Sequence, residues 1–400
     1  RLDETTGTAS YLSQVAVGAL PDNVQFSPDG TRLVVACEGE PSSDYLTDPE
    51  GSIGIINIMG QSPALLPATS ATLLGFKDFN AGGIRASELP SSVRIFGGAF
   101  GGAPSTVAQD LEPEYVAFAE DSSMAYVSLQ ENNAIAVVDL ITSKISKILA
   151  LGNKDYSNAE NALDVSDKDK NASVKGTMHH NGKGRINITA WKNVVGTYQP
   201  DTIASYAVNG VNYILTANEG DAREYISGEI NEDFETQISC ETEGLNWDTT
   251  QGACFNGDTP TMCAIKGLLN KENEVCFSYV EEFRVEDLTA NGSYGDFVAP
   301  IPASVAAIAD NFSPEITEQI TDEALGRLKI TTVNALNKDT NTVTTLQSYG
   351  ARSFSIWTES GDLVFDSGAD IAKITAGRLG EVFNASNDKK PDDKKNDRSS

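Results

Sequence analysis

The segment YILTANEGDAREY, residues 213–225, carries the pattern from which we predict the fold. It opens with Tyr213–Thr216, four residues that favour β-structure and show no helical period. The polar run Asn218-Glu219-Gly220-Asp221 follows, and its glycine allows the backbone to turn tightly. Oxygen ligands clustered on a bend suit Ca²⁺ or Mg²⁺. The segment therefore predicts a strand that ends in a candidate cation site, with a solvated acidic loop as the alternative.

The same layout occurs earlier in the chain. The segment LVVACEGEP, residues 33–41, is an apolar strand followed by a small residue and then Glu38-Gly39-Glu40. Two strand ends with the same acidic, glycine-centred sequence indicate a repeat. We expect the loops of such a repeat to point to one shared face.

The first repeat, near residues 15–58, has the order strand, turn, strand, loop, strand. Val24 and Phe26 alternate with polar residues, Ser27-Pro28-Asp29-Gly30 is a tight turn, and Thr31–Ala36 is the returning strand. This order is typical of an antiparallel meander, the unit of one β-propeller blade. Similar units lie near residues 112–140, 199–226 and 351–366.

The repeats predict an all-β protein, a β-propeller of antiparallel meander blades over residues 1–383. The repeats start farther apart than the roughly 40–50 residues of a compact blade, which predicts long loop insertions, two blades per period, or both. We expect the ring to be incomplete within this chain. Residues 384–400 are charged and almost free of apolar side chains, so they should form a flexible tail or an exposed loop.

The composition narrows the classes of partner. The 400 residues carry 29 Lys and Arg against 57 Asp and Glu, for a net charge of −28. This sign argues against nucleic acid, whose phosphates attract cationic proteins. It fits a protein whose surface gathers divalent ions. We expect no membrane span, because no apolar run has the required length.

The cysteines predict disulfide bonds. Four of the five lie in one insertion, residues 229–279, and are Cys240, Cys254, Cys263 and Cys276. Two disulfides with three alternative pairings are expected, together with an oxidising compartment. A zinc site is the rival interpretation, but close C-x-x-C spacing is absent. Cys37 stands alone and is interpreted as a small buried residue in preference to a soft metal ligand.

Two further regions have recognisable patterns: a polar region that contains Asp164–Asp169 and His179-His180, and a region with helical spacing over residues 315–328. Asp164, Asp167 and Asp169 resemble part of a calcium loop without the glycine and terminal glutamate of an EF-hand. His179-His180 is interpreted as a loop feature, because adjacent side chains in an extended chain point opposite ways. Apolar residues at near-helical spacing predict a helix over residues 315–328, started by Ser313-Pro314.

The acidic residues at equivalent places in the repeats are the candidate metal ligands, since a propeller would bring them round one end of its axis. They are Glu38, Glu40, Glu112, Glu114, Asp201, Glu219 and Asp221, to which Asp164, Asp167 and Asp169 are added. Arg223 is a candidate for holding a phosphate oxygen. The expected ion is Ca²⁺, with another divalent or transition metal as the alternative.

Several long motifs resemble the choice-of-anchor I domain family. They are LPDNVQFSPDGTRLVVACEGEP (20–41), DPEGSIGIINI (48–58), DLEPEYVAF (110–118), SDKDK (166–170), GRINITAWKNVVGTYQPDTIASY (184–206) and YILTANEGDAREY (213–225). The similarity covers most of the chain outside the cysteine-bearing insertion. The chain departs from the family at Cys37, where relatives usually carry Asn, and such domains normally have further propeller sequence on both sides.

The resemblance implies a secreted or surface-anchored β-propeller with an acidic, calcium-linked face. The group includes mesenchyme-specific cell-surface glycoproteins tied to biomineralisation, and bacterial relatives are often labelled alkaline phosphatase. We expect an extracellular, periplasmic or cell-surface location.

Three functional hypotheses follow. The first is a metal-dependent phosphoesterase acting on a phosphorylated small molecule, although no nucleophile with a partnered base is evident. The second is a non-catalytic adhesion, matrix or mineral-binding protein with structural calcium, whose partner is a surface polymer or a second chain completing the propeller. The third is purely structural, with acidic residues that cap turns and pair with Arg223 or Arg352.

Overall fold

A computed structural model describes most of the chain. The described residues are 5–8, 10–11, 14–58, 70–99, 104–169, 184–231, 233–234, 236–260, 262–263, 268–270, 275–288, 294–295, 297–298, 302–309, 311–337 and 339–383. His179-His180 and the predicted tail 384–400 lie outside them.

Two antiparallel meanders contain the three strands expected near residues 15–58 and 112–140, and each has a fourth strand that lies beyond the expected range. The first blade consists of β1 (Pro21–Phe26), β2 (Arg32–Cys37), β3 (Ser52–Asn57) and β4 (Thr72–Gly75). The second blade consists of β5 (Val116–Phe118), β6 (Met124–Leu129), β7 (Ala134–Asp139) and β8 (Lys144–Ala150). Gly30 takes a φ of 68° in the turn between β1 and β2, a conformation that suits glycine.

The third blade is assembled from two distant parts of the chain. It consists of β11 (Pro200–Val208), β12 (Val211–Asn218), β22 (Ser353–Thr358) and β23 (Leu363–Asp366). Within it β12 pairs with β22 so that Ile214 lies opposite Trp357. The predicted repeats near 199–226 and 351–366 therefore share one sheet, because residues 219–352 are inserted between its second and third strands.

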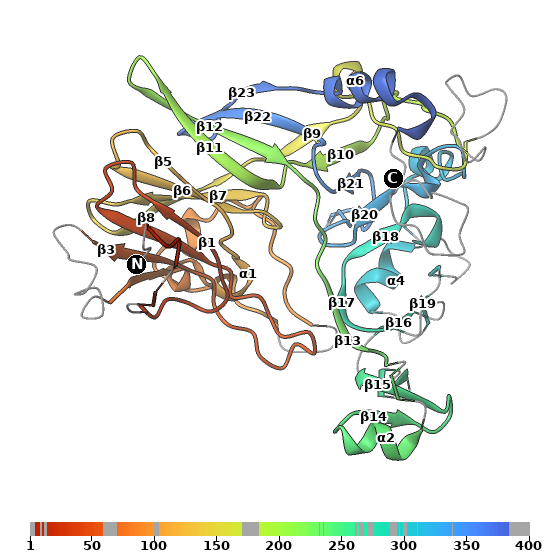
Figure 1. The fold of residues 1–400 in the computed structure, drawn as a ribbon. Helices are drawn as coiled ribbons and strands as arrows, with labels where there is room; N and C mark the ends of the chain where they lie inside the picture. The colour runs from red at the N-terminus through yellow and green to blue at the C-terminus, as the bar shows by residue number, and fades with distance from the viewer. Residues whose placement is uncertain are drawn as a thin grey trace.

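The three blades stack on one another (Figure 1). Val34, Ala36 and Ile53 of the first blade pack against one face of the second, which includes Val127 and Ala136. The opposite face of the second blade packs against the third. That contact is made by Tyr126, Ile135 and Val137 on one side and Ile203, Ile214 and Trp357 on the other. The fold is a β-propeller of four-stranded blades with long insertions.

The residues between β12 and β22, together with β9 and β10, form a second body that we call the insertion lobe (Figure 1). Its largest sheet has the order β14-β15-β13-β17-β16-β19. These strands are β13 (Glu224–Ile230), β14 (Asn246–Asp248), β15 (Ala253–Gly257), β16 (Leu268–Asn270), β17 (Val275–Val280) and β19 (Phe297–Val298). The smaller sheets contain β18 (Glu282–Arg284) with β20 (Lys329–Thr331), and β9 (Asn153–Asp155) with β10 (Val194–Thr197) and β21 (Leu346–Ser348).

The described helices are short. They are α1 (Val107–Asp110), α2 (Gln237–Thr242), α4 (Ala303–Ala309), α5 (Pro314–Thr317) and α6 (Asp370–Leu379). Single 3₁₀ turns occur at η2 (Lys77–Phe79), η3 (Ala86–Glu88), η4 (Ala159–Asn161), η5 (Val285–Leu288), η6 (Leu325–Arg327) and η7 (Gly380–Val382).

The predicted helix over residues 315–328 is wrong in extent. Ser313 caps α5 through its side chain and Pro314 opens it, as predicted, but the helix ends at Thr317. Turns and the 3₁₀ turn η6 follow. Ile316 and Leu325 are nevertheless fully buried in the core of the insertion lobe. Their spacing in the sequence therefore reflects this burial and does not indicate a continuous helix.

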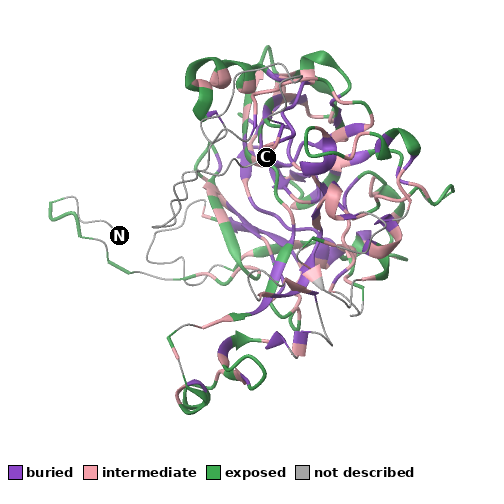
Figure 2. Cartoon of the chain, turned by 90° about the vertical axis from the view of Figure 1, so that its right-hand side faces the viewer, coloured by how far each residue is buried: buried purple, intermediate pink, exposed green. Residues whose placement is uncertain are grey.

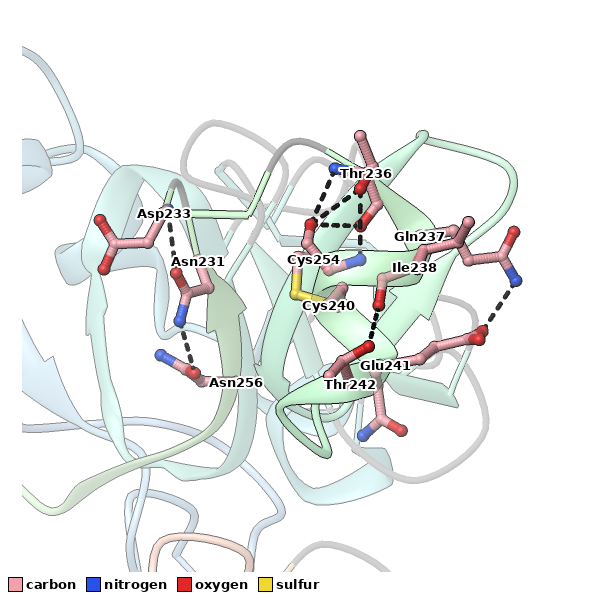
Figure 3. Close-up of a disulfide and its surroundings, with 12 residues drawn as sticks. Asn231, Asp233, Thr236, Gln237, Ile238, Cys240, Glu241, Thr242, Cys254 and Asn256 are labelled. Atoms are coloured by element: carbon pink, nitrogen blue, oxygen red, sulfur yellow. Dashed lines mark hydrogen bonds between the residues drawn. A yellow bond between two sulfur atoms is a disulfide. The ribbon is translucent and has the colours of Figure 1, made fainter.

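The cysteine-bearing insertion projects from the body of the molecule (Figures 1 and 2). Its two disulfides are confirmed, and they pair Cys240 with Cys254 and Cys263 with Cys276. The first joins helix α2 to strand β15 (Figure 3). Thr236 caps that helix by accepting a hydrogen bond from the Ser239 backbone amide.

Removal of the first disulfide is expected to loosen the insertion alone. Its loop spans 14 residues, and a loop of that length is worth about 3 kcal/mol in the chain-entropy model. Limited proteolysis of a Cys240→Ala/Cys254→Ala variant should show cleavage within residues 236–256, while the main melting transition stays within about 2 °C of that of the parent chain. Loss of the main transition would contradict this view of the insertion as a separate unit.

Candidate functional site

The acidic motifs meet because of how the blades are connected. In an antiparallel pair the first strand begins at the edge where the second strand ends. In each blade, therefore, the residues at the start of the first strand lie at the same edge as the residues that come directly after the second strand. The first strands β1, β5 and β11 contact one another in that order, so the three acidic edges come together.

Six carboxylates and one guanidinium gather at this place, which we call the acidic centre. Its members are Glu38 and Glu40 after β2, Glu112 and Glu114 before β5, Glu131 after β6, and Asp221 and Arg223 after β12. Five of the predicted ligands are thus brought together. Asp201 lies near Asp22 of β1, whose pKa is raised first by burial and then by the Asp201 charge.

Glu131 is the member that the sequence interpretation missed. Burial is the largest cause of the raised pKa of each of the other five carboxyls, and the negative charge of Glu131 raises all five further. The residue follows the second strand of its blade, the position that Glu38 and Glu40 occupy in the first blade. Comparison of the repeats would have found it.

Burial of the carboxylates, and then the charges of their neighbours, raises their pKa values. Burial, with the charges of Glu40 and Glu131 added, raises the pKa of Glu38 to about 7. Burial and the charge of Glu131 raise the pKa of Asp221 to about 6. The pKa values of the more deeply buried Glu112 and Glu114 are raised well above the usual range by the same causes.

Two carboxyl groups of the centre are in direct contact. The side chain of Glu114, which is 8 % exposed, reaches that of Glu131. Two carboxylates attract each other only when they share a proton or a cation. Beside them Oε1 of the fully buried Glu112 has no hydrogen-bond partner among the described residues. Oε2 of Glu131 likewise receives no hydrogen bond from that part of the chain.

Arg223 is enclosed on the inner side of the centre. Its guanidinium forms ion pairs with Glu112 and, at 3.3 Å, with Asp110. A terminal nitrogen also donates to the Asp110 carbonyl at 2.9 Å, and the guanidinium carbon lies 4.1 Å from the centre of the Phe96 ring. The residue is 3 % exposed. A phosphate could reach this guanidinium only by displacing carboxylates that already hold it.

A second buried arginine ties the centre to the insertion lobe. Nη2 of Arg94 lies 2.7 Å from Oε2 of Glu281, a fully buried residue that follows β17. Thr331 of β20 donates to the same oxygen at 2.6 Å, and the backbone amide of Arg223 donates to the other carboxylate oxygen. These contacts hold the insertion lobe against the edge of the blades at which the acidic centre lies.

The remaining predicted ligands lie elsewhere. Glu219 faces a cavity of about 720 Å³ that is also lined by Asn218, Arg352 and residues of α6. Asp167 is paired with Arg327 at 2.7 Å in the insertion lobe. Asp164 and Asp169 accept hydrogen bonds from the backbone amides of Asn187 and Arg185, respectively.

Cys37 packs among apolar side chains. The side chain is fully buried in β2 and packs with Val35 and Ile56 on the outer face of the first blade. Burial raises the pKa of its thiol. These observations agree with the interpretation as a small buried residue.

The donor chemistry of the acidic centre fits a hard cation, because the unpartnered acceptor atoms in it are carboxylate oxygens of Glu112 and Glu131. The spacing is more open than coordination requires. Within the described residues, no three His, Cys, Asp or Glu side chains stand close enough to hold a metal ion between them. An ion would therefore have to draw the carboxylates inward from their present positions.

A family model for the choice-of-anchor I domain matches residues 1–262 and 302–400. The chain belongs to the choice-of-anchor I domain family. Membership of this family and the two disulfides favour an extracellular or surface-associated protein. None of the helices in the described residues has the length and apolar character needed to span a membrane.

No curated protein sequence matches this choice-of-anchor I chain. Its similar solved structures include Kuenenia stuttgartiensis Hydrazine Synthase, at 13 % identity over 55 % of this chain and 48 % of that chain, with a TM-score of 0.21. They also include the Myceliophteria thermophila Cps50 (Swd1) beta-propeller domain, at 10 % identity over 66 % of this chain and 58 % of that one, with a TM-score of 0.23. The match spans less than two thirds of either protein, and TM-scores this low tell nothing about the function of the domain.

The raised pKa values predict how the metal-free domain responds to pH. Glu38, with a pKa of about 7, and Asp221, with a pKa of about 6, bind protons more tightly in the folded state than in the unfolded chain, where such groups titrate near about pH 4. The folded state therefore carries the extra protons between about pH 4 and 7, and the free energy of unfolding falls as pH rises through this window. Asp29, with a pKa lowered to about 2, stays ionised throughout.

Calorimetry in the presence of a chelator should give a melting temperature a few degrees lower at about pH 8 than at about pH 5.5. A Glu38→Gln variant should show a flatter dependence, because it lacks the group that titrates near pH 7. A melting temperature that rises with pH across this window would contradict the assignment.

Proposed function

We propose that the acidic centre binds a divalent cation, Ca²⁺ in the extracellular medium, and that the domain is a calcium-dependent binding protein of the cell exterior. The observation that carries the proposal is the contact between the carboxyls of the buried Glu114 and the half-buried Glu131, next to the unpartnered oxygen of Glu112. Such a group of carboxylates needs positive charge, and Arg223 alone offsets only part of it.

The residues that would hold the ion are Glu38, Glu40, Glu114 and Glu131, with the unpartnered oxygen of Glu112 behind them. They come from the first and second blades, and Asp221 adds the third. Bound calcium would neutralise charges that otherwise repel one another across three blades. The ion would thereby stabilise the edge at which the blades meet the insertion lobe.

The phosphoesterase hypothesis has less support. Its candidate phosphate ligand, Arg223, is already held by Asp110, Glu112 and Phe96. A strongly anionic site repels a phosphate unless a metal ion intervenes. A binding protein with structural calcium therefore fits the geometry better. Hydrolysis of an aryl phosphate in the presence of Ca²⁺, lost in a Glu131→Gln variant, would restore the enzymatic hypothesis.

Calorimetric titration of the metal-free domain with Ca²⁺ tests the proposal. Binding in the range of about 10⁻⁶ to 10⁻³ M is expected, the range of sensor and extracellular calcium sites. A Glu131→Gln variant should bind at least about tenfold more weakly, because it loses the carboxylate whose charge acts on the five others. Glu315→Gln, at an exposed position on α5, is the matched control and should leave the affinity unchanged. Equal affinities in all three proteins would place calcium elsewhere or exclude a specific site.

A further inference from the structure

The cavity that Glu219 faces lies where the third blade meets the insertion lobe. Its volume is about 720 Å³, within the usual range of small-ligand sites. Its walls come from the end of β12, the start of β22, strands β18, β20 and β21 of the lobe, and helix α6. The residues proposed to hold the cation do not line this cavity. The cavity is therefore a second candidate site.

Two glycines shape the wall that the third blade contributes. The segment after β12 crosses the segment before β22 so closely that a Cβ on Gly220 would lie 2.5 Å from the Tyr349 carbonyl carbon. Gly350 faces Gly220 across this crossing and takes a φ of 64°. Arg352 has a φ of 50°, a left-handed conformation that is uncommon for an arginine. Backbone strain of this kind clusters at ligand sites, and here it lies where the crossing brings Glu219 and Arg352 to one cavity.

The charged side chains of the cavity nearly balance. Glu219 and Arg352 come from the blade side, and both residues are exposed. On the lobe side Lys329 forms an ion pair with Glu282, and Asp164 adds a third carboxylate. Two cations against three carboxylates contrast with 29 against 57 over the whole chain. A ligand of high charge, whatever its sign, would therefore be repelled by part of the wall without a compensating net attraction.

The wall offers hydrogen-bond donors, acceptors and apolar surface together. Carboxylates only accept hydrogen bonds, whereas ammonium and guanidinium groups only donate them. A hydroxyl group does both, so a ligand with several hydroxyls can bond to either kind of group. Apolar side chains complete the wall, among them Leu163, Leu328, Ile371 and Phe383. Their carbon atoms suit the C–H groups of a sugar ring, because contact removes apolar surface of both from water.

We propose that this cavity binds a neutral saccharide, with Glu219 accepting and Arg352 donating hydrogen bonds to its hydroxyl groups. A carboxylate and a guanidinium each present two polar atoms in one plane, so each can bond two neighbouring hydroxyls. The inference does not depend on the cation proposed for the acidic centre, because that ion is assigned to other residues.

Saturation-transfer nuclear magnetic resonance on the full chain tests the proposal. The neutral probes are maltose, cellobiose and lactose. Cellobiouronate, which carries a carboxylate, and the chitosan disaccharide, which carries two amines, are the charged probes. At least one neutral disaccharide should receive saturation and bind with a dissociation constant of about 10⁻³ M or lower. Saturation of none of the probes, or tighter binding of a charged probe than of every neutral one, would overturn the proposal.

The same measurement with calcium and with a chelator keeps this proposal apart from the cation site. Binding of the sugar should agree within about twofold in the two conditions, because no proposed ligand of the ion lines the cavity. Loss of sugar binding in the chelator, with the protein still folded by far-ultraviolet circular dichroism, would place the sugar on the ion and overturn the assignment to this cavity.

Variants of the wall locate the bound sugar. Glu219→Ala and Arg352→Ala should each weaken binding at least about tenfold, because each removes a charged hydrogen-bond partner. The matched controls are Glu315→Ala on α5 and Arg378→Ala on α6, which remove the same charges from exposed positions outside the cavity and should bind as the parent chain does. Glu219 is exposed, so its variant keeps the test valid if Arg352→Ala reduces folding. Parental affinity in a folded Glu219→Ala protein would overturn the proposal.

Discussion

Replacement of Arg223 by methionine is expected to lower the free energy of unfolding by about 3–5 kcal/mol. The guanidinium is buried between Asp110 and Glu112 and covers the Phe96 ring. Methionine keeps much of the packing and removes the charge, so two buried carboxylates lose the cation that balances them. Chemical denaturation monitored by circular dichroism gives the value directly.

Two further variants make this prediction specific. Arg378→Met, at an exposed position on α6, removes the same charge and should change stability by less than about 0.5 kcal/mol. Arg223→Lys should recover only part of the loss, because an ammonium cannot contact both carboxylates and the ring as the planar guanidinium does. A fully stable Arg223→Met protein would show that the acidic centre is not electrostatically strained.

The effect of calcium on the melting temperature of the Arg223→Met variant is an independent test of where the ion binds. If the ion occupies the acidic centre, loss of the neighbouring positive charge increases its attraction to the carboxylates. Saturating calcium should then raise the melting temperature of Arg223→Met by more than that of the parent chain. An equal or smaller increase would contradict the placement of the ion beside Arg223.

Replacement of Trp357 by alanine is expected to cost about 3–5 kcal/mol of stability. The indole is 2 % exposed between the second and third blades, and its ring centre lies 4.8 Å from that of Tyr198. Its Nε1 donates to the Thr216 hydroxyl at 3.0 Å. Truncation would leave a cavity where two blades meet and would leave that hydroxyl without its donor.

A matched truncation on the next strand serves as the comparison. Val364→Ala removes apolar atoms from a position that is 54 % exposed, and should cost less than about 1 kcal/mol. The contrast also tests the composition of the third blade, since Trp357 packs there only if β22 pairs with β12. Similar losses in the two variants would contradict that pairing.

The sequence predicts the first two blades well because their signals are local. Alternating residues, the Ser27–Gly30 turn and the acidic strand ends all lie within one meander. The third blade is different, because Ile214 pairs with Trp357 across the whole insertion lobe. Nothing in either segment identifies its partner, so the two halves of one blade are indistinguishable from two separate repeats.

In the candidate site, too, the residues that local strand order brings together can be predicted, and those that tertiary packing brings together cannot. The rule that first strands begin where second strands end brings Glu38, Glu112 and Asp221 together, and it would also have predicted Glu131. Asp110 and Glu281 cannot be found in this way, since tertiary packing alone carries them to Arg223. Burial of Arg223 is likewise invisible in the sequence. The structural hypothesis predicts that acidic residues pair with Arg223, but it does not identify Asp110 and Glu112 as the partners.

The central claim is that a calcium ion binds the crowded carboxyls of the acidic centre, and release of protons on binding tests it most directly. Glu38 has a pKa of about 7, so the carboxyls of the metal-free protein hold protons near neutral pH that a cation must displace. Addition of calcium to weakly buffered, metal-free protein at about pH 6.5 should release on the order of one proton per ion bound, and clearly fewer at about pH 8.5. Calcium binding without proton release at the lower pH, or no binding at either pH, would contradict the account.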